Sequence, residues 1–171
     1  MGGSIAGSGG NVLRFIAAKA GNLVMKPNSR MVLWAEDNDE DIELTLHMLA
    51  KQAPGIDVTV VRDGVEALDY LFHSGKYNGR ATPDPSVVLL DIKMPKVDGI
   101  EVLRRMKGDE RLNKIPVVML SSSNQRDDVE ESYRLGASAY IVKPVDFSEF
   151  AESVKTACVF WALVNTLPSK A

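Results

Sequence analysis

The feature that most constrains the fold is a short apolar run, Val87–Leu90, that ends directly at an acid, Asp91. Four branched aliphatic residues in succession are typical of a strand buried on both faces, as in a parallel sheet covered by helices. After Asp91 the chain enters a loop that contains Pro95 and Gly99, residue types that interrupt strands and helices. Because ligands of open parallel sheets bind beyond the carboxyl ends of the strands, Asp91 is a candidate nucleophile or metal ligand.

Strands and helices are expected to alternate along the rest of the chain. Buried strands are predicted at residues 31–35, 56–61, 87–90, 115–120 and 139–142. Helices are predicted to begin near residues 38, 63, 100, 127 and 146, and the last one is expected to extend toward Thr166. This alternation predicts one α/β domain with a doubly wound, five-stranded parallel sheet in the order 2-1-3-4-5 and helices on both faces.

The first 29 residues differ in composition from the remainder. Glycine and serine dominate residues 1–10, which is typical of a flexible linker or of sequence added for expression. A short helix over Asn11–Met25 is an alternative, although isolated helices of that length are marginal in water. We therefore predict a flexible extension over residues 1–29 and one domain over residues 30–168 that includes an extended C-terminal helix.

Composition argues against several other classes of protein. A net charge of −3 and the lack of a long basic cluster argue against binding to nucleic acid. No apolar run approaches the roughly 20 residues that cross a bilayer, and the N-terminus lacks the features of a secretory signal. The single cysteine, Cys158, excludes an internal disulfide and fits a reducing cytosol. These observations predict a cytoplasmic protein that binds neither membranes nor nucleic acid.

Polar residues follow four of the predicted strands. Glu36 and Asp37 follow the first strand, Asp91 the third, Ser121 the fourth and Lys143 the fifth. In the order 2-1-3-4-5 the three carboxylates meet at one edge of the sheet. Like charges so close together are unfavourable unless a cation joins them, and a set of oxygen ligands suits Mg²⁺. With Mg²⁺ and the lysine ammonium the charges sum to zero, so the site is suited to a phosphoryl group that the Asp91 nucleophile accepts as an aspartyl phosphate.

These residues and the motifs around them resemble the receiver domain of two-component response regulators. The motifs are Glu36–Asp37, Asp91 with Met94–Pro95 and Asp98–Gly99, Ser121, and the run from Gly136 to Pro144, and they cover the chain from about Met31 onward. The resemblance implies a flavodoxin-like fold and transfer of a phosphoryl group from a sensor histidine kinase to Asp91. It also implies a Mg²⁺ site formed by Glu36, Asp37, Asp91 and the backbone carbonyl of Lys93.

The same resemblance assigns roles in conformational switching. Ser121 stands where the family has threonine or serine, and Tyr140 occupies the aromatic switch position. Lys143 would move to meet the phosphoryl group, and the Lys143–Pro144 peptide bond is usually cis in the family. The protein is therefore expected to be a signalling protein rather than an enzyme, with Mg²⁺-dependent self-phosphorylation and slow self-dephosphorylation.

Three further stretches are similar to the single-domain response regulators that are paired with cyanobacterial and bacterial phytochromes. They are the loop over residues 74–86, the run Glu131–Gly136, and the tail that contains Phe160–Trp161 and Thr166–Pro168. Two residues depart from the commonest receiver pattern, since Glu36 replaces an aspartate and Ser121 replaces the commoner threonine. No DNA-binding domain follows the receiver in this sequence, so output is expected through contacts with a downstream protein.

Other functions remain open on the same fold. A flavin- or nucleotide-binding protein needs a phosphate cradle rich in serine, threonine or glycine after the first strand, whereas residues 36–41 include five acids. A phosphatase with two aspartates spaced by one residue would need an acid in place of Lys93. A receiver-like module that no longer responds to phosphorylation is a further alternative, which the intact acids argue against.

The predicted C-terminal helix is apolar on more than one side. One stripe is expected to face the sheet and consists of Phe147, Phe150, Val154, Ala157 and Trp161. A second set adds apolar surface around it: Val159, Phe160, Leu163, Val164 and Leu167. One face of a sheet does not cover both sides of a helix. We therefore expect a homodimer through the C-terminal helix, the alternative being that the N-terminal extension, with Phe15 and Ile16, covers it.

Overall fold

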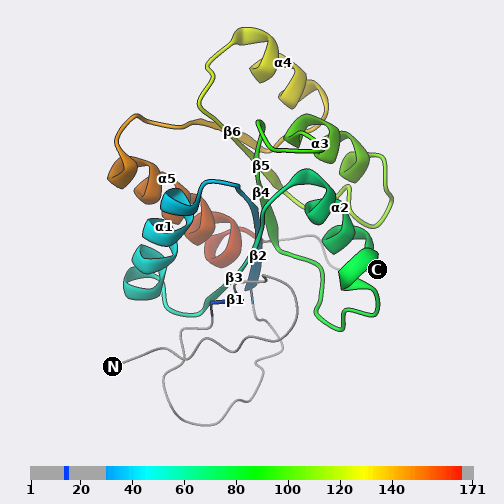
Figure 1. The fold of residues 1–171 in the computed structure, drawn as a ribbon, viewed down its shortest axis with the longest axis horizontal. Coiled ribbons are helices and arrows are strands. Elements are labelled where there is room, and N and C mark those ends of the chain that lie inside the picture. Colours follow the sequence, from blue (N-terminus) through cyan, green and yellow to red (C-terminus); the bar gives the residue numbers. More distant parts are fainter. Residues whose placement is uncertain (1–13, 16–29, 167–171) are drawn as a thin grey trace.

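Strands and helices alternate along the chain in the computed structural model, which describes residues 14–15 and 30–166 (Figure 1). The strands are β1 (Arg14–Phe15), β2 (Arg30–Ala35), β3 (Ile56–Val61), β4 (Val87–Asp91), β5 (Val117–Ser121) and β6 (Ala139–Val142). The helices are α1 (Asp39–Gln52), α2 (Gly64–Phe72), α3 (Gly99–Lys107), α4 (Arg126–Arg134) and α5 (Phe147–Val159), with a 3₁₀ turn at Gly75–Tyr77 and a π-helical turn at Phe160–Val164. The predicted strands and helices are therefore present.

The sheet has the order β1-β3-β2-β4-β5-β6. Strands β2 to β6 pair in parallel, and their order is the predicted 2-1-3-4-5, so the doubly wound sheet is confirmed. The sequence did not predict β1, which lies antiparallel to the edge strand β3 with Arg14 opposite Thr59 and Phe15 opposite Val58.

The alternative of a helix over Asn11–Met25 is wrong for Arg14 and Phe15. Pairing with an unprotected sheet edge supplies backbone hydrogen bonds directly, whereas a helix of this length without a packing face is marginal. The remaining residues of the proposed extension lie outside the described residues. The division of the chain at residue 30 therefore stays a prediction.

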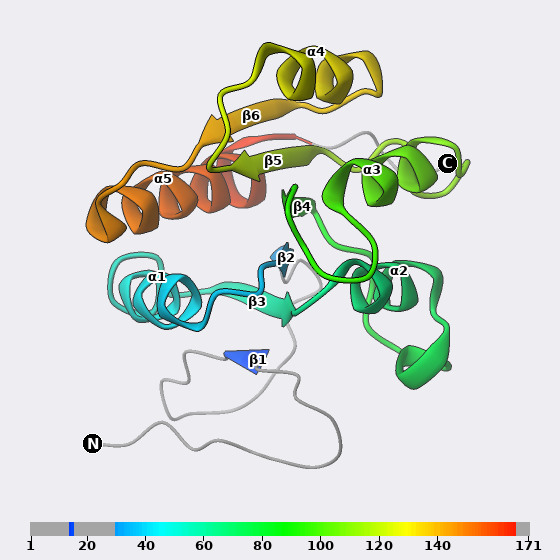
Figure 2. The same cartoon turned by 45° about the horizontal axis from the view of Figure 1, so that its top comes forward.

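Two helical layers cover the sheet, with α1 and α5 on one face and α2, α3 and α4 on the other (Figure 2). Successive residues of β2 alternate between the two cores. Val32 and Trp34 pack with α1 and α5, whereas Leu33 packs with α2 and α3. The Trp34 ring lies 6.5 Å from that of Phe150 in α5. Because each such side chain contributes about 1.5–3 kcal/mol when fully buried, burial on both faces holds β2 and β4 at the centre of the sheet.

Side-chain caps fix where four of the helices begin. The carboxylate or amide oxygens of Asn38, Asp63, Asp98 and Asp146 accept hydrogen bonds from backbone N–H groups in the first turns of α1, α2, α3 and α5, respectively. Each cap contributes about 1 kcal/mol. Since these four helices follow strands, the caps also set the path of the chain at the carboxyl edge of the sheet.

The C-terminal helix is longer than the sheet that it covers. Phe150, Val154 and Ala157 are buried against the sheet as predicted, and α5 continues into the π-helical turn. Phe147 is 51% exposed, so its predicted place on the buried stripe is wrong, because it is the first residue of α5 and lies beyond the cover of the strands. Leu167 and Pro168 lie outside the described residues.

The long loop between α2 and β4 is held by Arg80. Its guanidinium lies 4.0 Å from the centre of the Tyr70 ring and donates hydrogen bonds to the carbonyl oxygens of Tyr70, Thr82 and Pro83. It also lies 2.8 Å from the His73 ring. Arg111 lies 2.5 Å from Asp84 Oδ1 in the same loop and donates to the Leu71 carbonyl oxygen. Two arginines therefore hold this long connection against α2.

Two further expectations concern the backbone. None of the peptide bonds between described residues is cis, so the expectation of a cis Lys143–Pro144 bond is wrong. The trans form is the more stable isomer of X–Pro bonds by roughly 0.5–1 kcal/mol. Within residues 14–15 and 30–166, no helix has both the length and the apolar character that a bilayer crossing requires.

Candidate functional site

The parallel register brings the predicted site residues to one level of the sheet. Ala35 pairs with Leu90, Asp91 with Leu120, and Ser121 with Val142. The residues at or just beyond these strand ends are Glu36, Asp37, Asp91, Ser121 and Lys143. The topology therefore gathers side chains from β2, β4, β5 and β6 at the carboxyl edge.

Three carboxylates form the centre of the site. One oxygen each from Glu36, Asp37 and Asp91 lies within 4.8 Å of the others. Glu36 and Asp91 are buried and Asp37 is exposed, so the group opens to solvent on one side. Oxygen ligands at this spacing fit a hard divalent cation that keeps some of its water. The donor set thus fits the Mg²⁺ that the sequence predicts.

Lys143 supplies the positive charge of the site. Its Nζ lies 2.6 Å from Glu36 Oε2 and 3.2 Å from Asp91 Oδ2, and 4.9 Å from the centre of the Phe150 ring. Burial alone would lower the pKa of Lys143, but the carboxylates of Glu36 and Asp91 outweigh it and raise the pKa. The ammonium therefore stays charged where it neutralises two buried acids.

Burial dominates the electrostatics of the two buried acids. Burial raises the pKa of Glu36 to about 7, against the effect of Lys143, and the charge of Asp91 adds to the rise. Burial likewise raises the pKa of Asp91, although Lys143 and a hydrogen bond from the Lys93 N–H at 3.2 Å oppose it. Without a divalent cation, one ammonium does not fully compensate these acids.

The loop that follows Asp91 is tightly folded. A Cβ on Gly99 would lie 2.3 Å from the Asp91 carbonyl oxygen, so only glycine fits there. Lys96 has a φ of 66°, in the left-handed region that non-glycine residues rarely adopt, and its Nζ lies 2.6 Å from Asp63 Oδ2 at the start of α2. The backbone that carries Lys93 is thus held between Asp91 and α2.

Ser121 and Tyr140 are joined through one residue of the loop after β5. Ser121 is buried, and its Oγ accepts a hydrogen bond from the Ser123 N–H at 3.0 Å. The Tyr140 hydroxyl donates to the Ser123 carbonyl oxygen at 3.0 Å. A change at the Ser121 hydroxyl therefore reaches the tyrosine through a single peptide segment.

Sequence reasoning missed two residues of this region. Asp41 Oδ2 lies 3.5 Å from Lys143 Nζ, although its position in the first turn of a helix suggested only an interaction with the helix dipole. Asp41 carried no signal beyond its place in the acidic run of residues 36–41. Ser123, the link to Tyr140, carried no signal beyond its place in a serine run.

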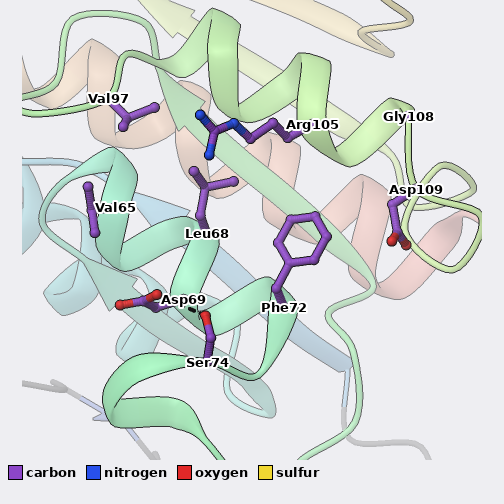
Figure 3. A pocket seen from close by; sticks show the side chains of 9 residues that line it. All are labelled: Val65, Leu68, Asp69, Phe72, Ser74, Val97, Arg105, Gly108 and Asp109. Atoms are coloured by element: carbon purple, nitrogen blue, oxygen red, sulfur yellow. Dashed lines mark hydrogen bonds between the residues drawn. The ribbon is translucent and has the colours of Figure 1, made fainter.

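The most capacious groove that we describe lies elsewhere. It encloses about 630 Å³ between α2 and α3, and Figure 3 shows Val65, Leu68 and Phe72 on one wall with Arg105 on the other. None of the predicted site residues lines it. The charged residues of the carboxyl edge therefore lie apart from this groove.

Comparison with known proteins gives consistent matches over the domain. The family model for the response regulator receiver domain matches residues 32–155. The response regulator Rcp1 of Synechocystis sp. is 34% identical over 140 residues, which are 82% of this chain and 94% of Rcp1. A crystal structure of the Mn²⁺-bound form of Rcp1 superposes with a TM-score of 0.75 and covers 82% of this chain and 99% of that chain.

Two solved structures with higher identity carry phytochrome in their descriptions. The phosphorylated cyanobacterial phytochrome response regulator RcpA is 41% identical with a TM-score of 0.75, over 82% of this chain and 99% of that chain. The bacteriophytochrome response regulator AtBRR is 51% identical with a TM-score of 0.64, over 82% of this chain and all of that chain, 100%.

Proposed function

This chain belongs to the response regulator receiver domain family, and from that premise we propose that Asp91 accepts a phosphoryl group from a sensor histidine kinase. The protein is a signalling component of a two-component phosphorelay and not a classical enzyme. The observation that carries the proposal is the grouping of Glu36, Asp37 and Asp91 around Lys143 at the carboxyl edge. The flavin- or nucleotide-binding alternative receives no support from the matches.

The proposal assigns the metal site to the same carboxylates. Glu36, Asp37 and Asp91 would hold Mg²⁺, with the backbone carbonyl of Lys93 as a further ligand. When bound, Mg²⁺ supplies positive charge to the phosphoryl oxygens and favours the ionised form of Asp91. The crystal structure of the relative Rcp1 in its Mn²⁺-bound form supports this assignment, because Mn²⁺ is a divalent cation like Mg²⁺.

Phosphoryl transfer needs a nucleophile, here the Asp91 carboxylate, and positive charge that neutralises the phosphoryl oxygens. An oxygen of the Asp91 carboxylate forms a bond to phosphorus, and the bond from phosphorus to the donor breaks and leaves its electron pair on the donor. Lys143, 3.2 Å from Asp91, then neutralises charge on the transferred group. Slow hydrolysis of the acyl phosphate by water would reset the protein.

Incubation with acetyl phosphate and Mg²⁺ tests the assignment of Asp91. Intact-protein mass spectrometry is expected to show one phosphoryl group that hydroxylamine removes and that Asp91→Asn lacks. Asp37→Ala is expected to slow incorporation by at least about tenfold, since a lost metal ligand removes several kcal/mol of charge stabilisation. The exposed Asp127 provides the matched control, and Asp127→Asn should behave as the wild type. Undiminished incorporation in Asp91→Asn would exclude the assignment.

We assign the conformational switch to Ser121 and Tyr140. A phosphoryl group on Asp91 adds roughly −1.5 to −2 charges and strong acceptor oxygens, which compete for the Ser121 hydroxyl and for Lys143. Movement of Ser121 would disturb its hydrogen bond to Ser123 and hence the bond from Tyr140 to the same residue. The state of Asp91 thereby reaches the surface formed by α4, β6 and α5.

The partners follow from the relatives and from the surface. The cognate kinase is proposed to be a phytochrome, because RcpA and AtBRR are described as phytochrome response regulators, and the output is proposed to pass to a downstream protein. The proposal includes a cytoplasmic location, which agrees with the buried, unpaired Cys158. The proposed kinase is tested by measuring phosphoryl transfer from a purified phytochrome kinase to this protein.

We further propose that the protein is a homodimer through its C-terminal helix. Phe160, Leu163 and Val164 are exposed at the π-helical turn, and a groove of about 420 Å³ between α5 and β6 lies beside them. A two-fold contact buries such a patch on both partners at once. The groove is lined by Ile141, whereas Tyr140 packs on the opposite face of β6. If the dimer contact extends to the Tyr140 face, phosphorylation and dimerisation strengthen each other by linkage.

A further inference from the structure

Asp41 adds a fourth carboxylate to the phosphorylation site. Lys143 Nζ lies 3.5 Å from Asp41 Oδ2, beside its closer contacts with Glu36 and Asp91. The Asp41 side chain is only 10% exposed, and its backbone N–H donates to Asn38 Oδ1 at 3.0 Å, which fixes it in the first turn of α1. Three carboxylates from three different segments therefore share one ammonium group.

We propose that Asp41 is a positioning residue for phosphoryl transfer: it holds Lys143 on the α1 side of the site and opposes the binding of an anionic phosphoryl donor. The proposal rests on the proposed function of Asp91 as phosphoacceptor. Lys143 Nζ contacts both Asp41 and Asp91, so Asp41 competes with the transferred group for the same ammonium. The strength of the interaction between Asp41 and Lys143 therefore sets how readily the site accepts a phosphoryl group.

The charge balance gives the direction of the effect. The four carboxylates of Glu36, Asp37, Asp41 and Asp91 face one ammonium and one divalent cation, which leaves a net charge of −1 where three carboxylates would leave none. A phosphoryl donor brings further negative charge into this field. In a partly buried site such repulsion is weakened less by solvent than at the surface. Removal of the Asp41 charge is therefore expected to favour the donor and to disfavour the metal.

These two opposite effects distinguish positioning from damage. Loss of the Asp41 charge should weaken Mg²⁺ binding, because less negative charge faces the cation. It should also lower the concentration of phosphoryl donor that gives half the maximal rate. A variant whose helix start or site geometry is merely disturbed would lose both. The comparison of the two directions in one protein therefore identifies the role of the charge.

The experiment uses Asp41→Asn in the full chain. Initial rates of phosphorylation are measured by intact-protein mass spectrometry against acetyl phosphate concentration at saturating Mg²⁺. The concentration that gives half the maximal rate is expected to fall about three- to tenfold, with the maximal rate changed less than about twofold. The Mg²⁺ Kd, measured by titration calorimetry without donor, is expected to rise about three- to tenfold.

Matched variants keep the proposal falsifiable. Glu40→Gln removes the same charge from an exposed neighbour in α1 and should leave both quantities within about twofold of the wild type. Asp41→Glu keeps the charge and should restore the wild-type donor dependence, and Asp41→Ser replaces Asp41→Asn if the latter does not fold. If Asp41→Asn and Asp41→Ser both show the donor dependence of the wild type and incorporate phosphoryl groups at Asp91 normally, the proposed role of Asp41 is wrong and the proposed function of Asp91 stands. A wild type that takes up no phosphoryl group at Asp91 overturns the proposed function, and this inference with it.

Discussion

At the scale of single residues, the burial of Glu36 makes the site respond to pH. Its carboxyl group is fully buried, and burial raises its pKa from the ordinary value of 4.5 to about 7. Because the folded pKa lies above the unfolded one, protonated Glu36 favours the folded state. This contribution is complete below about pH 4.5 and is lost as the pH rises through about 7.

The metal-free protein should therefore lose stability as the pH rises. Its free energy of unfolding, measured by urea denaturation in EDTA, is expected to fall by about 1–3 kcal/mol between roughly pH 5 and roughly pH 8. Saturating Mg²⁺ should remove most of this dependence, since a cation then compensates the ionised acids.

Glu36→Gln is the matched control for this pH response. The amide keeps the shape of the side chain but does not titrate, so the metal-free variant should show a shallower decline than the wild type. Equal slopes for the two proteins would show that other groups determine the response.

The residues of the site differ in how far the sequence reveals them. The positions of Glu36, Asp37, Asp91, Ser121 and Lys143 follow from strand ends, because a parallel sheet aligns those ends whatever the details of packing. The contact of Asp41 with Lys143 depends instead on how α1 packs beside the connection between β6 and α5 that carries Lys143. That packing is tertiary, and an acid in the first turn of a helix already has a local explanation.

At the scale of elements, the loop from β5 to α4 connects the acceptor to Tyr140. Ser121→Ala removes the oxygen that accepts from the Ser123 N–H, a loss of about 1 kcal/mol. We expect phosphorylation within about threefold of the wild type, since the nucleophile and metal ligands are untouched. Hydrogen exchange over residues 122–125 and 139–142 should lose most of its response to phosphorylation.

Ser122→Ala supplies the comparison for this experiment. Ser122 is exposed and adjacent in the chain, so its substitution should leave the exchange response as in the wild type. A phosphorylated Ser121→Ala protein with the full wild-type response would disprove coupling through the serine hydroxyl.

The elements themselves were predicted where their patterns are strong. Continuous apolar runs and helical repeats identify the strands β2 to β6 and the five α-helices, because burial and periodicity specify them locally. Three elements of the described residues were missed, one of them the 3₁₀ turn at Gly75–Tyr77 within the predicted polar loop, and the other two for physical reasons. Strand β1 depends on a free edge provided by β3, and the π-helical turn at Phe160–Val164 has no distinct pattern of apolar residues.

At the scale of the whole molecule, the exposed apolar residues at the end of the C-terminal helix predict self-association. Phe160 is 48% and Val164 64% exposed, and each contributes about 1.5–3 kcal/mol when fully buried. Phe160→Glu combined with Val164→Glu should therefore raise the dimer Kd at least about 100-fold. Light scattering coupled to size-exclusion chromatography measures the result.

Val145 provides a control with the same chemical change. It is fully exposed between β6 and α5, away from the π-helical turn, and Val145→Glu should remain a dimer. A wild type that is monomeric at high micromolar concentration, with or without phosphorylation, would exclude the homodimer.

The π-helical turn has a consequence for how this surface is oriented. A π turn accommodates one more residue than an α-helical turn, and one residue corresponds to about 100° of rotation about a helix axis. Ala162, inside the turn, stays buried in the same core as Val154 and Ala157, whereas Phe160, Leu163 and Val164 are exposed. Deleting Leu163, which follows the buried Ala162, would rotate Val164 and the residues after it around the axis and leave the buried stripe in place. The angular position of the exposed side chains around the helix axis therefore sets the direction in which this domain contacts a second copy. A single insertion or deletion after Ala162 can alter that direction without any change to the core.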